Sequence, residues 1–155
     1  MARTKAIVES AFDADPQRSV GYLIRDSARL ILAKLQLQLE PHDVTLGQYF
    51  VLRELWEREG ATQRQLSARI GIGEQSAVAT IDAMEQRDLV VRVRSKQDRR
   101  KTHIYLTARG RGLREQLLSY AAHVINTATD GFEPGEVDTL RALLAKLKQR
   151  LEQPG

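Results

Sequence analysis

Residues 62–106 read TQRQLSARIGIGEQSAVATIDAMEQRDLVVRVRSKQDRRKTHIYL, and this stretch decides the fold that the sequence predicts. A capping box at Thr62–Gln65 opens a short first helix, which ends at Gly71 because the Gly-Ile-Gly found there favours a tight turn. After the turn, apolar side chains recur at four- and three-residue steps and predict a second helix over residues 74–87. Two helices separated by a short glycine turn are therefore expected.

The same stretch ends in a predicted β-hairpin. Residues 89–93 and 102–106 are rich in β-branched and apolar side chains, and they flank the charged segment 94–101. Helix, turn, helix and basic hairpin is the order of a winged helix-turn-helix. In that fold the second helix enters the major groove of DNA, and the hairpin, or wing, reaches the backbone or the minor groove.

Amphipathic helices are expected on both sides of this unit. Residues 19–40 carry apolar side chains at three- and four-residue steps, and a second capping box at Thr45–Gln48 opens a helix that should end near Gly60. A long helix is predicted from Thr107 onward, and the last helix carries an aliphatic seam on one face. The seam consists of Leu140, Leu143, Leu144, Leu147 and Leu151.

The fold class that follows is mainly α with a small β-hairpin wing, in a single domain over residues 1–155. We expect a winged helix-turn-helix lobe at 45–106, flanked by dimerisation helices at 19–40 and 107–152. The leucine seam finds little apolar surface left in its own chain, which favours a homodimer. An intramolecular bundle is the alternative.

Composition excludes much chemistry. The chain of 155 residues has no cysteine, which rules out disulfides, thiolate zinc sites, iron-sulfur clusters and thiol peroxide sensing. No apolar run reaches the roughly 18 residues of a membrane span, and no secretory signal is evident, so we expect a cytoplasmic protein that does not contact membranes. The absence of His-x-Glu, Gly-x-Ser-x-Gly and phosphate-loop patterns argues against an enzyme.

Positive charge is concentrated in the middle third of the chain. The net charge is +4, but residues 61–112 hold 11 basic and five acidic residues, whereas the remainder holds 13 basic and 15 acidic residues. This asymmetry indicates that the middle third faces a polyanion such as double-stranded DNA. The alternative is an ordinary solvated surface.

Three segments resemble the signature of the MarR (multiple antibiotic resistance regulator) family. They are Leu66–Gly71, Ile81–Val90, and Asp98–Arg100 followed by Ile104–Gly110. In that family the wing carries Asp-x-Arg and the next helix opens with Leu-Thr-x-x-Gly, and both occur here at the expected spacing. The resemblance spans nearly the whole chain. It implies a homodimeric, sequence-specific transcriptional regulator, a repressor that a small aromatic or anionic ligand releases from a pseudo-palindromic operator.

The resemblance also implies roles for the wing residues. Arg100 would enter the minor groove, where a planar and permanently charged guanidinium fits well, while Asp98 would orient the wing. Arg99, Lys96 and Lys101 would contact phosphates. The alternative is that the charged tip is only a solvated turn.

The second helix departs from the family pattern at two positions. Ala79 stands where family members often place an arginine, so base reading would fall to Gln75 and Ser76, with Val78 and Ala79 touching thymine methyl groups. Asp88 replaces the usual glycine before Leu-Val, and aspartate tolerates a left-handed turn better than most residues.

Three further cations would contact phosphates or are surface charges: Arg64, Arg92 and Arg94.

An effector site is implied in the crevice between the dimerisation helices and the DNA-binding lobe. Cations and aromatic rings on the two helices that would line it are Tyr22, Arg25, Arg29, Tyr49 and Arg53. The alternative is that each is an ordinary surface or core residue.

No cofactor is expected, and a metal site at His42 with Glu40 and Asp43 is a minor option. A ligand-independent architectural DNA-binding protein is the alternative function, which ligand-dependent loss of DNA affinity would distinguish.

Overall fold

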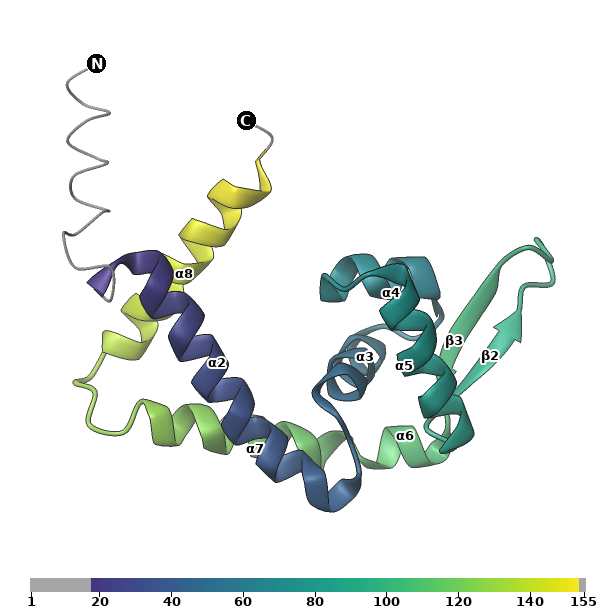
Figure 1. The fold of residues 1–155 in the computed structure, drawn as a ribbon, viewed down its shortest axis with the longest axis horizontal. Helices are drawn as coiled ribbons and strands as arrows, with labels where there is room; N and C mark the ends of the chain where they lie inside the picture. The colour runs from purple at the N-terminus through teal and green to yellow at the C-terminus, as the bar shows by residue number, and fades with distance from the viewer. Residues whose placement is uncertain (1–17, 154–155) are drawn as a thin grey trace.

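The computed structural model describes residues 18–153 and confirms a mainly helical fold with a small antiparallel sheet. Figure 1 shows a winged lobe at one end of the molecule and a group of long helices, the arm, at the other. The arm consists of α2 (Val20–Leu39), α7 (Arg114–Ala128) and α8 (Glu136–Glu152). The lobe consists of α3 (Leu46–Glu57), β1 (Ala61–Thr62), α4 (Gln63–Ile70), α5 (Glu74–Gln86), β2 (Val90–Arg94), β3 (Thr102–Leu106) and α6 (Ala108–Gly112).

Local sequence signals set the starts of the lobe helices as predicted. At α3, Thr45 Oγ1 accepts the Gln48 amide at 3.3 Å and the Gln48 side chain accepts the Thr45 amide at 3.2 Å. The same reciprocal pair opens α4 between Thr62 and Gln65. Each capping box satisfies two of the amides that a helix start leaves unbonded. Gly71 ends α4 in the left-handed conformation, with φ of 76°, so the glycine turn before α5 is confirmed.

The wing belongs to a three-stranded antiparallel sheet in the order β1-β3-β2. The predicted hairpin is confirmed, with Val90 opposite Leu106 and Arg94 opposite Thr102. The strand β1 was not predicted, because two residues are too short for a periodic pattern. It pairs Ala61 with Ile104 and thereby joins the base of the wing to the start of α4.

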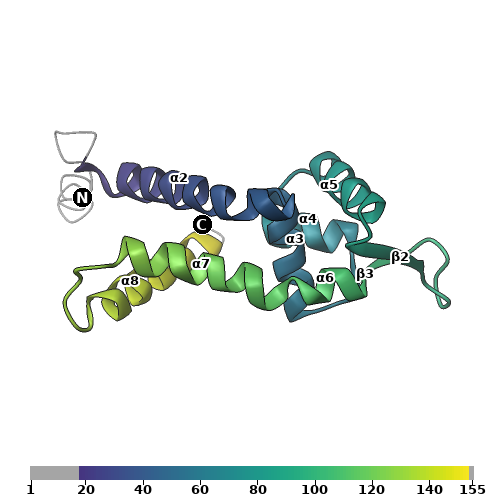
Figure 2. The same cartoon turned by 90° about the horizontal axis from the view of Figure 1, so that it is seen from below.

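One core extends from the lobe into the arm. Its fully buried side chains include Leu39, Leu52, Leu55, Leu66, Ile81, Met84, Leu89, Ile104 and Leu117. Figure 2 shows α2 and α7 side by side as they leave the lobe, and their contact continues the core through Leu35 and Val124. Trp56 packs against the core, and its Nε1 donates to the carbonyl oxygen of Gly110 at 3.0 Å.

The prediction of one long helix from Thr107 onward is wrong in one respect, because the chain forms two helices there. Helix α6 is capped by Thr107, whose side chain accepts the Gly110 amide at 3.1 Å, and α7 begins at Arg114 after a break at Leu113. Two glycines, Gly110 and Gly112, lie in α6, and glycine weakens a helix interior. Gly110 is required here, because a Cβ atom at this position would lie 2.2 Å from the carbonyl oxygen of Leu89.

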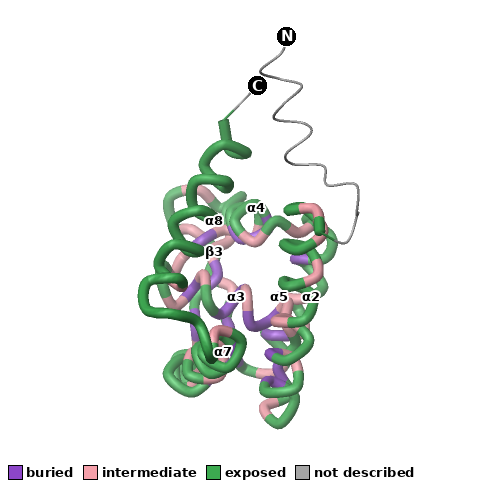
Figure 3. The backbone as a smooth tube through the Cα atoms, turned by 90° about the vertical axis from the view of Figure 1, so that its left-hand side faces the viewer, coloured by how far each residue is buried: buried purple, intermediate pink, exposed green. Residues whose placement is uncertain are grey.

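Helix α8 has no buried residue within the described part of the chain. The predicted leucine seam is present on it and exposed: Leu143 and Leu151 are 60% and 77% exposed. Figure 3 shows nearly all of α8 in the colour of exposed residues, and Val137 is of intermediate burial. Among residues 18–153, no helix has both the length and the apolar character needed to cross a bilayer.

A Gly110→Ala substitution tests the contact between α6 and Leu89, just before β2. The added methyl group collides with a backbone oxygen that cannot move away, so we expect a loss of about 1–3 kcal/mol in the free energy of unfolding, or more. Urea denaturation followed by circular dichroism at fixed protein concentration measures it. In the matched control, Gly112→Ala, the methyl group meets no atom within 4 Å and should change stability by less than about 1 kcal/mol. Equal effects of the two substitutions would contradict this assignment.

Asp88 provides a second test, because it adopts a positive φ of 55° between α5 and β2. The left-handed turn inferred from its position in the family pattern is confirmed. We expect Asp88→Val to lower the free energy of unfolding by about 1–2 kcal/mol, since a β-branched side chain is strained in this conformation. Asp88→Gly should retain or raise stability, because glycine adopts positive φ without a steric penalty. A valine variant as stable as the glycine variant would show that the turn is not strained.

Candidate nucleic-acid interface

Helix α5 presents the predicted base-contacting residues to solvent. Its N-terminal turns expose Gln75, Ser76, Val78 and Ala79. The opposite face buries Ala77, Ile81 and Met84 in the lobe core. The burial pattern therefore leaves one small and mostly uncharged face of α5 free for a partner.

The tip of the wing is organised by short hydrogen bonds rather than by packing. Ser95 donates its amide to the Lys101 carbonyl at 2.8 Å, and Ser95 Oγ accepts the amides of Gln97 and Asp98 at 3.2 Å. Asp98 Oδ1 accepts the Arg100 amide at 3.1 Å. The Asp98 carboxylate thus fixes the backbone from which Arg100 extends.

The cations of the wing differ in what they contact. Lys101 lies 3.9 Å from the Asp98 carboxylate. Arg94, Lys96, Arg99 and Arg100 are exposed, and within residues 18–153 none of the four forms an ion pair. These side chains therefore project charge into solvent, where an anion could meet it.

Arg64 lies apart from the wing tip in sequence but close to the base of the wing in space. It lines a hollow of about 800 Å³ between the start of α4 and strand β3, together with Arg100 and Lys101. The hollow is lined by Thr62, Gln63, Arg64, Gln65, Ala68, Arg100, Lys101, Thr102 and His103, and no carboxylate is among them. Arg64 is 89% exposed and lies 3.8 Å from Glu74, a weak contact.

Arg92, one of the cations considered for a phosphate contact, is instead paired within the lobe. Its guanidinium lies 2.5 Å from Asp82 Oδ1 and 2.5 Å from Glu85 Oε2, and its amide donates to Glu85. Burial opposes the charged form, but the hydrogen bonds to Glu85 and Asp82 outweigh it and raise the pKa of Arg92. The pairing joins β2 to α5 and so holds the wing against the helix.

The residues considered for an effector site lie in two groups. On α2, the Arg25 guanidinium lies 5.2 Å from the centre of the Tyr22 ring, and Arg29 pairs with Asp26. On α3, Tyr49 is buried among lobe residues, whereas Arg53 is exposed. Within residues 18–153, no hydrogen bond, ion pair or ring contact joins the two groups.

Tyr49 has an unusual environment for a phenol. It is 1% exposed, its ring packs edge-on against Phe50 and Trp56, and its hydroxyl has no hydrogen-bond partner in the described part of the chain. Burial raises the pKa of Tyr49, and the nearby Arg53 partly opposes that rise. Tyr49 is therefore a core residue of the lobe.

His42 is engaged in a side-chain contact. Its Nε2 lies 3.0 Å from the Tyr120 hydroxyl in a hydrogen bond between the end of α2 and α7. The residue follows α2 in the short 3₁₀ helix η2 (Glu40–His42). The contact spans 78 residues of sequence, and no local pattern could have predicted it.

Comparison with known proteins decides the family. Residues 44–102 match the model of the MarR family. The HTH-type transcriptional regulator TtmR of Methylorubrum extorquens is 31% identical over 149 residues, which cover 94% of this chain and 74% of that protein. The chain belongs to the MarR family.

Solved structures of MarR-family proteins share the fold. The transcriptional repressor CouR, bound to a 23-mer DNA duplex, is 26% identical with a TM-score of 0.79, over 87% of this chain and 96% of that one. CouR from Rhodococcus jostii RHA1 bound to p-coumaroyl-CoA is 25% identical with a TM-score of 0.76, over 87% and 95%. This MarR-family protein is therefore a DNA-binding transcriptional regulator with a winged helix, and its relatives are named as regulators rather than enzymes.

The two kinds of wing cation should respond differently to substitution. Arg92→Met removes the link between wing and α5 and should weaken DNA binding about tenfold, with the salt dependence unchanged because Arg92 is held by carboxylates. Lys96→Ala should make the slope of log affinity against log salt shallower by about 0.9 for each bound chain, as expected for one lost phosphate contact per chain. Fluorescence anisotropy at several salt concentrations measures both. A slope that falls equally in the two variants would place Arg92 on a phosphate.

Proposed function

We propose that this MarR-family regulator is a homodimeric repressor, which binds a pseudo-palindromic operator and is released from it by a small aromatic or anionic ligand. The observation that carries the proposal is the combination of an uncovered apolar arm with a basic wing, four of whose cations form no ion pair within residues 18–153. The wing supplies the contacts to DNA, and the arm supplies the surface through which two copies would associate. The dimerisation helices are those expected at 19–40 and 107–152.

The apolar surface of the arm supports dimerisation. Helices α2, α7 and α8 surround a groove of about 500 Å³ whose apolar lining includes Leu30, Ile125, Phe132, Leu140 and Leu144. Each of these five side chains is between 42% and 47% exposed. A continuous set of exposed apolar residues of this kind is typical of an interface between protein chains. A twofold axis through the arm would place two copies of α5 about one helical turn of DNA apart.

Contacts to DNA would divide between positioning and reading. In this division Arg64, Arg94, Lys96, Arg99 and Lys101 neutralise phosphates. The list of residues proposed to reach base edges or the minor groove is Gln75, Ser76, Val78, Ala79 and Arg100, with Asp98 orienting Arg100. Because Gln75 is the only long amide among them, specificity would depend partly on the shape of the minor groove around Arg100.

Effector binding is supported by CouR, a relative whose structure contains p-coumaroyl-CoA. In this chain the corresponding proposal places a carboxylate or aromatic ring near Tyr22, Arg25 and Arg29 on one helix and near Arg53 on the other, whereas Tyr49 is buried in the lobe core and is left out of the site. A ligand would reduce DNA affinity to the extent that it favours a lobe orientation unable to bind both half-sites. A protein that binds DNA with no such response would be an architectural DNA-binding protein.

Titration of labelled DNA from the region upstream of the protein's own gene tests the proposal. Anisotropy measured with excess unrelated DNA should show saturable binding that survives competition and weakens steeply with salt. Arg100→Ala should weaken binding to A·T-rich sites preferentially, whereas Lys96→Ala should weaken all DNA alike. Binding that the competitor abolishes would favour architectural DNA binding. The absence of any binding would refute the role of the wing.

The same complex provides the test for an effector. Addition of p-coumaroyl-CoA and of simple aromatic carboxylic acids should lower the anisotropy of the bound DNA in a saturable manner for at least one compound. A matched DNA complex of the Arg25→Ala variant should need more of that compound for the same effect. Release that is identical in this variant would exclude Arg25 from the effector site.

A further inference from the structure

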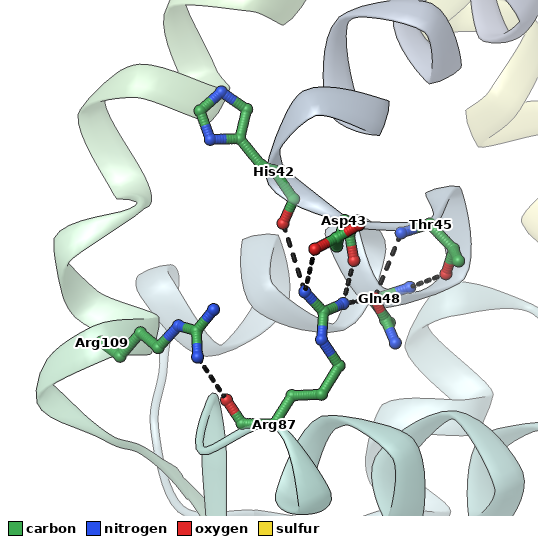
Figure 4. Close-up of polar contacts among 6 residues, drawn as sticks. All are labelled: His42, Asp43, Thr45, Gln48, Arg87 and Arg109. Carbon is green, nitrogen blue, oxygen red and sulfur yellow. Dashed lines mark hydrogen bonds and ion pairs between the residues drawn. The ribbon is translucent and has the colours of Figure 1, made fainter.

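A cluster of polar contacts joins the end of α5 to the corner between the arm and the lobe (Figure 4). Arg87 caps the C-terminus of α5, and its side chain is 27% exposed. Its guanidinium donates to the backbone oxygens of His42, at 3.2 Å, and of Asp43, and to Gln48 Oε1 at 3.3 Å. The Asp43 carboxylate lies 3.8 Å away. One side chain therefore contacts three consecutive parts of the corner: η2, the turn after it and the start of α3.

The corner that receives Arg87 is itself fixed on the arm. Asp43 adopts a positive φ of 53°, and this conformation ends η2 with its carbonyl groups turned towards Arg87. His42 is bonded to Tyr120 on α7, and Tyr120 also accepts a hydrogen bond from Gln116 at 3.0 Å. Gln48 is buried and belongs to the capping box of α3. The acceptors of Arg87 thus lie at the junction of α2, α3 and α7.

Arg87 is also held from the other side. Its backbone oxygen accepts a hydrogen bond from Arg109 Nη1 at 3.2 Å, which joins it to α6 (Figure 4). Helix α5 packs on α3, α4 and β2 within the lobe, and the side chain of Arg87 hydrogen-bonds to η2 and to the turn after it. This side chain therefore adds a polar link between α5 and the corner to the packing of α5 on α3.

The chemistry of the site suits arginine better than lysine. Backbone carbonyls at the end of a helical turn carry partial negative charge and attract a cation. A planar guanidinium with five donors can serve several acceptors at fixed angles, whereas a lysine ammonium acts as a point charge on a flexible stem. The contact is half-buried and multidentate, unlike the exposed ion pairs elsewhere on the surface.

We propose that Arg87 is a positioning residue that fixes the angle between α5 and the arm, and so sets the half-site spacing at which the protein binds DNA. The proposal rests on the dimeric DNA binding proposed above. Arg87 touches no base in this account. It acts by keeping the two lobes at one separation, so that both copies of α5 meet the major groove together.

The absence of cysteine allows a direct measurement of lobe separation. A single spin label at Arg69→Cys, an exposed position on α4, reports the distance between the two lobes by pulsed electron paramagnetic resonance. With Arg87 present we expect one narrow distance distribution, and Arg87→Met should shift or broaden it. Arg87→Lys should give an intermediate distribution. An unchanged distribution in both variants would overturn the proposal.

A DNA-binding experiment tests the same proposal. It measures affinity for a set of operators whose two half-sites are moved apart or together by one and two base pairs. The natural spacing should be preferred by the unmodified protein, and Arg87→Met should reduce that preference about tenfold while binding to an isolated half-site stays unchanged. Loss of half-site binding in parallel with the whole operator would indicate a merely structural role and overturn the proposal. Thermal unfolding of each variant shows whether it folds. If Arg87→Met does not fold, Arg87→Lys takes its place in the comparison.

Arg111→Met is the matched control. Arg111 forms a bidentate pair with Glu59 at 2.9 Å, and both residues of this pair lie in the lobe. Its loss should leave both the distance distribution and the spacing preference unchanged, and an effect equal to that of Arg87→Met would overturn the proposal. If the labelled protein shows no distance between two copies, the proposed dimer fails and this inference fails with it. A dimer with one separation that Arg87→Met does not alter refutes the inference alone.

Discussion

The exposed leucine seam on α8 is the constraint that the rest of the arm must satisfy. Within residues 18–153 the helix buries none of its side chains, although it presents Leu140, Leu143, Leu144, Leu147 and Leu151. A helix of 17 residues gains little stability from intrinsic propensity alone, so the seam needs another apolar surface. Each Å² of apolar surface removed from water contributes about 25 cal/mol. We propose that a second copy supplies that surface and thereby determines where two lobes lie on DNA.

Inside each lobe, α5 is held firmly while its outer face is left open. Its apolar side packs in the core, Asp82 and Glu85 hold the wing through Arg92, and Arg87 holds the corner of the arm. The polypeptide leaves α5 through a strained turn, after which the Leu89 carbonyl accepts the Thr107 amide and contacts Gly110. These attachments explain how a helix with few donors could still recognise DNA, since its position is defined even where its base contacts are weak.

Features encoded by short sequence patterns could be predicted. The two capping boxes, the Gly71 turn and the hairpin each depend on neighbours within a few positions, and all were confirmed. The left-handed turn at Asp88 followed from its place in the family pattern. The exposed leucine seam was likewise visible as a periodic pattern.

The features that sequence reasoning missed depend on contacts between distant residues. Strand β1 exists because Ala61 meets Ile104, and the break between α6 and α7 accompanies the packing of Gly110 against Leu89. Arg87 hydrogen-bonds to Asp43, which lies 44 residues earlier in the chain. Arg92 looked like a phosphate contact because its sequence neighbours are basic, whereas its acidic partners lie on another element. No periodicity reports such pairings.

The central claim is that two copies of this chain associate through the arm, and the mass of the protein in solution tests it most directly. Light scattering coupled to size-exclusion chromatography, repeated over a wide dilution range, should give twice the chain mass of 17.5 kDa. A variant with Leu143→Asp and Leu147→Asp should shift that mass towards a single chain. A single-chain mass at every concentration, with α8 still helical by circular dichroism, would contradict the account.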